Sequence, residues 1–199
     1  ASATATASPT PSPTATAAAP QPPTAIPAPT CVAAGGRVIA IGDSVMIGAA
    51  GEMQRLICNI EIDAAQSRWV MAAIDILRAQ RAAGALGDTV IIHMGSNGPF
   101  YAGQFEEMMA VLRDVRSVIF INVKVPREWE GPNNAMLAAG VKRYKNTVLI
   151  DWYAASVKQP GIFWSDGTHL RPEGARFYTE LIVAAIQGAR APAVERPRQ

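Results

Sequence analysis

The stretch RVIAIGDSVMIGAAGEMQRLIC, residues 37–58, carries the pattern that decides the fold. Its first six residues, 37–42, are a short apolar run rich in β-branched side chains and bounded by glycine, which is typical of a buried strand. From residue 45 to residue 58 the apolar side chains recur at helical spacing instead. A buried strand that leads through a short turn into a helix is the building unit of an α/β protein.

The same unit recurs along the chain up to residue 187. Further strands are predicted over residues 60–64, 89–95, 117–125 and 147–152. Further helices are predicted over residues 69–84, 104–115, 133–146 and 172–187. Strands that alternate with helices of this length predict a parallel sheet with both faces covered. In such a sheet, ligands bind beyond the carboxyl ends of the strands.

The two ends of the chain differ in composition from this body. Residues 1–30 are rich in proline, threonine and alanine and carry no charge, so we expect a disordered, extended linker. Residues 190–199 hold three arginines and one glutamate, a short basic tail that accounts for the formal net charge of +2. Residues 31–189 then form one folded domain. Its balanced charge predicts no nucleic-acid partner, and its short apolar runs predict no transmembrane segment.

Cys31 and Cys58 are the two cysteines of the chain. They are too few and too far apart for a zinc site, which needs about four closely spaced ligands. Cys31 precedes the first predicted strand and Cys58 ends the first predicted helix, so both lie at the same end of the sheet. A disulfide and a pair of free thiols both remain open, and a disulfide would indicate an oxidising compartment.

Three short motifs follow predicted strands or precede the last helix: GDS at 42–44, GSNG at 95–98 and DGTH at 166–169. A serine nucleophile needs a base to take its proton, an acid to orient that base, and donors for the oxyanion. The serine of the first motif lies at a strand-to-helix turn, where its backbone N–H points toward developing negative charge. The three motifs together predict nucleophilic catalysis at the carboxyl edge of the sheet.

In this order, the three motifs resemble blocks I, III and V of the SGNH hydrolases. Within that superfamily the chain is similar to the extracytoplasmic domain fused behind membrane acyltransferase-3 modules, as in peptidoglycan O-acetyltransferases. The stretches that match are AIGDSVMIGAA, IDAAQSRW, HMGSNG, VKVPREWEGPNNAML and VLIDWYAAS…DGTHLRPEGARFY. The resemblance implies a flavodoxin-like three-layer α/β/α sandwich with a five-stranded parallel sheet. It also implies a covalent acyl-serine intermediate and neither a metal nor another cofactor.

The resemblance carries roles over to individual residues. Ser44 matches the nucleophile, His169 the general base and Asp166 the acid that orients it. Asn97 matches an oxyanion donor, together with the backbone N–H of Ser44. Other SGNH esterases supply a further donor from a glycine, where this chain has AQSR at 65–68. We assign that role to the backbone N–H of Ser67, which needs no glycine unless its φ is positive.

Other interpretations of these residues stay open. Ser44 is also a favoured helix N-cap, and His169 is also a candidate cap of the preceding turn. Asp151 follows the fifth predicted strand and competes with Asp166 for His169, although the three-residue spacing favours Asp166. His93 lies inside an apolar strand and is interpreted as structural.

Four more residues near the motifs have expected roles. Asp43 precedes Ser44 and is expected to hold the turn through its side chain. Arg68, Arg127 and Trp164 are candidate substrate contacts, because they fall in loops near the predicted site.

The resulting hypothesis is an extracytoplasmic serine O-acyltransferase that passes an acyl group to a hydroxyl of peptidoglycan or another surface glycan. Acetyl is the expected acyl group. Its partners are the acyl donor and the glycan acceptor, with a membrane acyltransferase domain before residue 1 as a further candidate. We expect a monomer tethered to the cell surface by the linker, and an esterase when water is the acceptor. The alternatives are a secreted carbohydrate acetylesterase and a non-catalytic glycan-binding module on a stalk.

Overall fold

The computed structural model describes residues 31–190. The predicted linker, residues 1–30, lies outside the described residues, and so do residues 191–199 of the predicted tail. Arg190, which the sequence assigned to the tail, is instead the last residue of helix α6 (Pro172–Arg190). None of the helices within residues 31–190 has the length and apolar composition needed to cross a bilayer.

Five parallel strands form one sheet in the order β2-β1-β3-β4-β5. The strands are β1 (Val38–Gly42), β2 (Ile60–Ala64), β3 (Thr89–His93), β4 (Ser117–Ile121) and β5 (Thr147–Ile150). The predicted parallel sheet is therefore confirmed. The strand order changes direction between β1 and β3, where Gly42 lies beside His93. Ligands bind at such a switch point in open α/β sheets.

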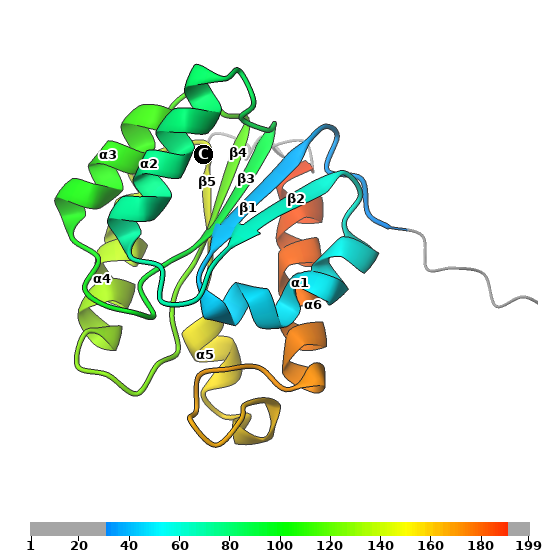
Figure 1. Cartoon of the computed structure of the whole chain (residues 1–199), viewed down its shortest axis with the longest axis vertical. Coiled ribbons are helices and arrows are strands. Elements are labelled where there is room, and N and C mark those ends of the chain that lie inside the picture. Colours follow the sequence, from blue (N-terminus) through cyan, green and yellow to red (C-terminus); the bar gives the residue numbers. More distant parts are fainter. Residues whose placement is uncertain (1–30, 191–199) are drawn as a thin grey trace, which may run out of the picture.

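Helices cover both faces of the sheet (Figure 1). The helices before α6 are α1 (Ser44–Leu56), α2 (Val70–Ala82), α3 (Ala102–Leu112), α4 (Glu130–Val141) and α5 (Trp152–Ser156). One apolar core packs α1 and α6 against one face, and a second core packs α2, α3 and Leu137 of α4 against the other. This is the predicted three-layer α/β/α sandwich, which is confirmed.

Strand β5 is shorter than predicted, because the chain turns into a helix after Ile150. Asp151 is the N-cap of α5, and its side chain accepts the N–H of Ala154 at 3.0 Å. Trp152, predicted as the strand end, is the first residue of α5 and is completely buried. The sequence reasoning missed this helix and the 3-10 turn at Pro160–Ile162, since both are too short to show periodicity.

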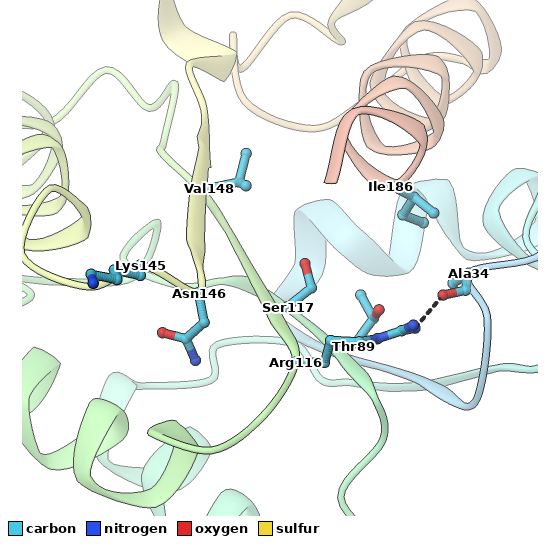
Figure 2. A pocket seen from close by; sticks show the side chains of 8 residues that line it. All are labelled: Ala34, Thr89, Arg116, Ser117, Lys145, Asn146, Val148 and Ile186. Atoms are coloured by element: carbon cyan, nitrogen blue, oxygen red, sulfur yellow. Dashed lines mark hydrogen bonds between the residues drawn. The ribbon is translucent and has the colours of Figure 1, made fainter. Parts of the chain in front are cut away.

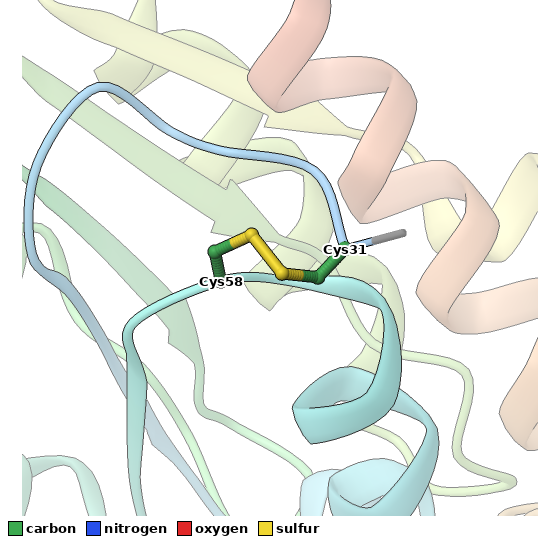
Figure 3. Close-up of a disulfide and its surroundings, with 2 residues drawn as sticks. All are labelled: Cys31 and Cys58. Carbon is green, nitrogen blue, oxygen red and sulfur yellow. A yellow bond between two sulfur atoms is a disulfide. The ribbon is translucent and has the colours of Figure 1, made fainter. Parts of the chain in front are cut away.

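A disulfide joins Cys31 to Cys58 at the start of the described chain (Figure 3). Next to it, Val32 donates its N–H to Leu56 at 2.8 Å and accepts the N–H of Cys58 at 3.0 Å. Residues 31 and 32 are thus fastened to the end of α1.

A hollow of about 320 Å³ opens at the amino ends of the strands, the end of the sheet opposite Ser44. Figure 2 shows its lining, in which Arg116 donates to the carbonyl oxygen of Ala34 at 2.6 Å. Thr89 and Ser117, which also line it, are the first residues of β3 and β4. The predicted motifs therefore do not face this hollow.

Candidate active site

Ser44 lies at the carboxyl end of β1, as the first residue of α1. The N-cap of this helix is Asp43, whose side chain accepts the N–H of Val45 at 3.1 Å, so Ser44 is not the cap. The turn into the helix is tight at Gly42, where an added Cβ would lie 2.5 Å from Cβ of Met46. Ser44 itself is half-buried at the helix N-terminus.

His169 links the serine to a carboxylate. Its Nε2 lies 2.9 Å from Oγ of Ser44, and its Nδ1 lies 2.8 Å from Oδ2 of Asp166. Both distances are those of hydrogen bonds. The structure thus brings Ser44, His169 and Asp166 together in one hydrogen-bonded chain, in which Ser44 and His169 are 125 positions apart in the sequence.

The histidine and its carboxylate lie on one short hairpin before α6. An antiparallel bridge joins Phe163 to Leu170, and Trp164 donates its N–H to the carbonyl oxygen of His169 at 2.9 Å. The turn of the hairpin passes through Gly167, whose φ of +68° favours glycine. The hairpin therefore fixes the backbone on both sides of the Asp166–His169 pair.

The carboxylate of Asp166 is held by three donors. Its Oδ1 accepts the backbone N–H groups of Thr168 and His169 at 2.9 Å each, and its Oδ2 faces the imidazole. Partial desolvation raises the pKa of Asp166, but these hydrogen bonds outweigh it, so the pKa lies below its ordinary value. The group is therefore ionised at neutral pH and orients the imidazole through Nδ1.

Asp151, the competing acid, has other partners. Its Oδ1 accepts Nδ2 of Asn122 at 2.8 Å and the N–H of Ala154 at the start of α5. The structure pairs His169 with Asp166, as the three-residue spacing favours.

Asn97 lies in the turn after β3 and lines the same hollows as Ser44. Its Nδ2 donates to the carbonyl oxygen of Arg68 at 3.3 Å, and the second amide hydrogen can serve a ligand. The turn is held by Asn133, which is buried and donates to the carbonyl oxygens of Gly95 and Gly98 at 3.0 Å each. Sequence reasoning missed Asn133. The signal was an asparagine at a buried position of a predicted helix.

Ser67 lines a hollow together with Ser44 and His169. Its φ is +52°, in the left-handed region that favours glycine. The structure therefore meets the condition, a positive φ, under which this position would favour glycine. Serine occupies the position at a cost of about 1 kcal/mol in backbone strain.

Arg68 does not contact the hollows, and its assignment as a substrate contact is corrected. Its guanidinium donates to the carbonyl oxygens of Gly42 at 3.3 Å and Asp63 at 2.5 Å, and to Oδ1 of Asp63 at 2.5 Å. Only 10% of the side chain is exposed. Arg68 instead ties the carboxyl ends of β1 and β2 together.

Two hollows meet at Ser44, Asn97 and His169. The β4 hollow, of about 470 Å³, is lined by Ser44, Ser96, Asn97, Val125, Pro126, Arg127, Trp129, Asp166, Thr168 and His169. The α1 hollow, of about 420 Å³, is lined by Ser44, Ile47, Gly48, Gln66, Ser67, Asn97, Trp164, His169 and Leu170. Of the candidate substrate contacts, Arg127 lines the β4 hollow and Trp164 the α1 hollow. A ligand can approach the serine from either side.

His93, behind the site, is completely buried, and its Nδ1 shares a hydrogen bond of 2.7 Å with the hydroxyl of Tyr178. Burial lowers the pKa of His93, although the negative charge of Asp43 opposes this. The histidine is therefore neutral at pH 7 and packs inside the sheet, away from both hollows.

No family model matches the chain. Curated relatives are similar to it, among them YrhL of Bacillus subtilis, at 33% identity over 150 residues. A second is the peptidoglycan O-acetyltransferase OatA of Listeria monocytogenes, at 30% over 150 residues. Each alignment covers 75% of this chain and 24% of the relative, so the chain spans about a quarter of the length of these relatives.

Solved structures share the fold. The C-terminal catalytic domain of the peptidoglycan O-acetyltransferase OatA of Streptococcus pneumoniae superposes with a TM-score of 0.70 at 22% identity, over 77% of this chain and 93% of that one. A member of the lipolytic G-D-S-L family from Veillonella parvula superposes with a TM-score of 0.63 at 16% identity, over 76% and 98%. The chain is therefore similar in sequence to peptidoglycan O-acetyltransferases over three quarters of its length, and it shares its fold with the OatA catalytic domain and with the lipolytic G-D-S-L protein.

Proposed function

We propose that this domain is a serine O-acyltransferase that transfers an acetyl group to a hydroxyl of peptidoglycan. The observation that carries the proposal is the continuous hydrogen-bonded chain from Ser44 through His169 to Asp166, open to two hollows. The names of the curated relatives support acetyl as the acyl group and peptidoglycan as the acceptor.

The first half of the reaction loads the serine. Oγ of Ser44 attacks the carbonyl carbon of the acyl donor while its proton passes to Nε2 of His169. The negative charge on the carbonyl oxygen is stabilised by the N–H of Ser44, the N–H of Ser67 and the amide of Asn97. The tetrahedral intermediate then breaks its bond to the leaving oxygen or sulfur, which takes the proton from His169.

The second half unloads the serine. A sugar hydroxyl gives its proton to Nε2 of His169 as its oxygen attacks the acetyl carbonyl. The bond to Oγ breaks, Ser44 recovers the proton, and the acetylated sugar leaves. Asp166 stabilises the imidazolium in both halves. If water replaces the sugar, the same steps release acetate.

We also propose that the domain works outside the cytoplasm, as part of a longer protein. The Cys31–Cys58 disulfide supports an oxidising compartment. The quarter-length match to the relatives supports further domains, of which a membrane acyltransferase domain would supply the acyl group. Residues 1–30 would act as the tether.

The test is the partition of the acetyl group. The domain is incubated with an activated acetyl ester, with and without peptidoglycan oligosaccharides, and both acetate and acetylated sugar are measured. We expect acetylated sugar to form at the expense of acetate, with Ser44→Ala as the control that forms neither. Release of acetate that no oligosaccharide changes would contradict the transferase.

That contradicting result would favour a carbohydrate acetylesterase, the second candidate. The observation in its favour is that nearly half of each side chain of His169 and Asp166 is exposed, at 47% and 49%, so water reaches the acyl-serine. A non-catalytic glycan-binding module predicts instead that a sulfonyl fluoride fails to label Ser44.

A further inference from the structure

We propose that the buried hydrogen bond between His93 and Tyr178 positions the two halves of the active site relative to each other. One half is the pair of turns after β1 and β3, which carry Ser44 and Asn97. The other half is the hairpin before α6, which carries His169. His93 and Tyr178 line neither the α1 hollow nor the β4 hollow, so they are positioning residues and not catalytic ones.

The bond joins two completely buried groups. Nδ1 of His93 and the hydroxyl of Tyr178 lie 2.7 Å apart, and the two rings stack with their centres 5.5 Å apart. Burial lowers the pKa of His93 and raises the pKa of Tyr178, so both groups are neutral at pH 7. Nε2 of His93 has no hydrogen-bond partner among the described residues, so the imidazole is held through Nδ1. Such a bond is costly to break, because water cannot replace the lost partner.

On the side of the sheet, His93 lies between the two turns of the first half. It is the last residue of β3, and its neighbour in register on β1 is Gly42, two residues before Ser44. Asn97 follows His93 by four residues. The carboxylate of Asp43 accepts one backbone N–H from each turn. The imidazole is therefore attached to the part of the sheet that carries both turns.

On the side of the helix, Tyr178 is connected to the hairpin by close packing. An added Cβ on Gly174 of α6 would lie 2.2 Å from the carbonyl oxygen of Ile162, at the base of the hairpin. The ring of Tyr178 meets the buried indole of Trp152 edge-on at 5.3 Å, and this indole meets the ring of Phe163, on the hairpin, at 5.8 Å. Because protein interiors are close-packed, a shift of Tyr178 is passed on to the hairpin.

The bond differs in kind from the other contacts between α6 and the sheet. Among the described residues, no other side chain of residues 172–188 forms a hydrogen bond with the sheet. The core between them is built from apolar side chains, whose attraction is non-directional. A hydrogen bond has a preferred distance and angle. The bond between His93 and Tyr178 therefore fixes the register of α6, and with it the hairpin, on the sheet.

The first test removes the bond and keeps the packing. Tyr178→Phe deletes the hydroxyl, whereas the control Thr179→Val deletes a second buried hydroxyl of α6, which donates to Ala175 within the helix. Hydrolysis of an activated acetyl ester by the full chain is measured per folded molecule. We expect Tyr178→Phe to lower kcat about tenfold at unchanged KM, a part of the 10²-fold that a misplacement of about 1 Å can cost. Thr179→Val should keep the kcat of the wild type.

A double variant separates positioning from stability. His93→Leu combined with Tyr178→Phe leaves neither partner of the bond unpaired, so the double variant should resist urea better than either single variant. Its kcat should stay about tenfold low, because the bond is still missing. His93→Gln, whose amide can still bond to the hydroxyl of Tyr178, should keep more of the kcat than His93→Leu.

The position of the base can also be observed without turnover. The chain has two histidines, so nuclear magnetic resonance of isotope-labelled imidazole nitrogens gives two sets of signals, and His93→Gln identifies those of His169. In the wild type, Nε2 of His169 lies 2.9 Å from Oγ of Ser44. We expect the Nε2 resonance in Tyr178→Phe to move toward that of a nitrogen without a hydrogen bond. It should stay in place in Thr179→Val.

The proposal would be overturned by an unchanged kcat in folded Tyr178→Phe, by a kcat that recovers together with stability in the double variant, or by His169 resonances that do not move. The inference rests on the proposed mechanism at Ser44 but not on the acceptor. Failure of the proposed function would instead appear as hydrolysis of the ester by the wild type with no transfer to peptidoglycan oligosaccharides, and all three measurements could still be made.

Discussion

Asp43 joins the turn that carries Ser96 to the turn that carries Ser44. Oδ2 of Asp43 accepts the backbone N–H of Ser96 at 3.3 Å, across 53 positions of the sequence, while Oδ1 accepts the N–H of Val45. The aspartate is completely buried. Ser44 follows Asp43 in the sequence, and Asn97 follows Ser96. The carboxylate of Asp43 therefore fixes Ser44 relative to the side-chain amide of Asn97.

Asp43→Asn should therefore disturb the site as well as the fold. An amide can accept from only one of the two N–H groups, since its nitrogen is itself a donor. We expect a loss of about 1–3 kcal/mol in the free energy of unfolding and a fall of about 10² in kcat from misplaced groups. Denaturation and kcat per folded molecule measure the two effects. An unchanged kcat in the folded variant would mean that Asp43 contributes to stability and not to the position of the site residues.

Ser44→Ala and His169→Ala should each abolish turnover of a small acetyl ester without loss of the fold. The two residues act as one unit, so the double variant should be little worse than either single variant. Rates are compared at equal folded fraction by circular dichroism. A single variant that keeps a near-normal rate would remove that residue from the mechanism.

Asn97→Ala should lower kcat by about 10²–10³, the usual cost of one oxyanion donor. Substrate binding should change little, because the charge develops only in the transition state. Steady-state kinetics separates the two parameters. A change confined to KM would mean that Asn97 contacts the ground-state substrate.

Asp166→Asn should lower kcat, whereas Asp151→Asn should lower stability. The first keeps the geometry but favours the wrong tautomer of His169, a change that costs about 10⁴ in kcat in a triad. The second weakens the contacts to Asn122 and to the start of α5 and should cost about 1 kcal/mol of stability. Activity per folded molecule distinguishes them. A larger fall in kcat from Asp151→Asn than from Asp166→Asn would mean that Asp151, and not Asp166, is the acid that orients His169.

His93 should make the domain less stable in acid. Its pKa is lowered in the folded state, so below its ordinary pKa of about 6.5 the unfolded chain takes up a proton that the folded chain does not. The free energy of unfolding should fall with decreasing pH, by up to about 1.4 kcal/mol per pH unit from this group. The fall continues until the pH reaches the lowered pKa.

His93→Gln provides the comparison, since glutamine does not titrate and can still bond to Tyr178. Urea denaturation of both proteins at pH 7, 6 and 5 should show a smaller acid dependence in the variant. Equal slopes would mean that His93 does not contribute.

The sheet could be predicted from sequence because each strand is a short apolar run between turn residues. The Asp166–His169 pair was also predictable, since a three-residue spacing closes within one turn and depends on little else. The end of β5 was not, because Asp151 could continue the strand or cap a helix. Its side chain is also held by Asn122, from the end of β4, a tertiary contact that the local sequence does not show.

Arg68 and Ser67 show what local sequence leaves open. The guanidinium of Arg68 is bound by carbonyl oxygens that meet only when β1 and β2 pair. Ser67 has a positive φ in the loop after β2, and serine is a residue type that gives no sign of it. The local sequence predicts neither feature.

The disulfide at Cys31 decides how a mechanical load enters the domain. A pull on the chain before residue 31 acts first on a covalent bond to Cys58, and through it on the end of α1 and the start of β2. Strand β1 lies behind this bond and leads directly to the turn of Ser44. Tension applied from that side should therefore act on the disulfide before it acts on β1, so that Ser44 should keep its position beside His169.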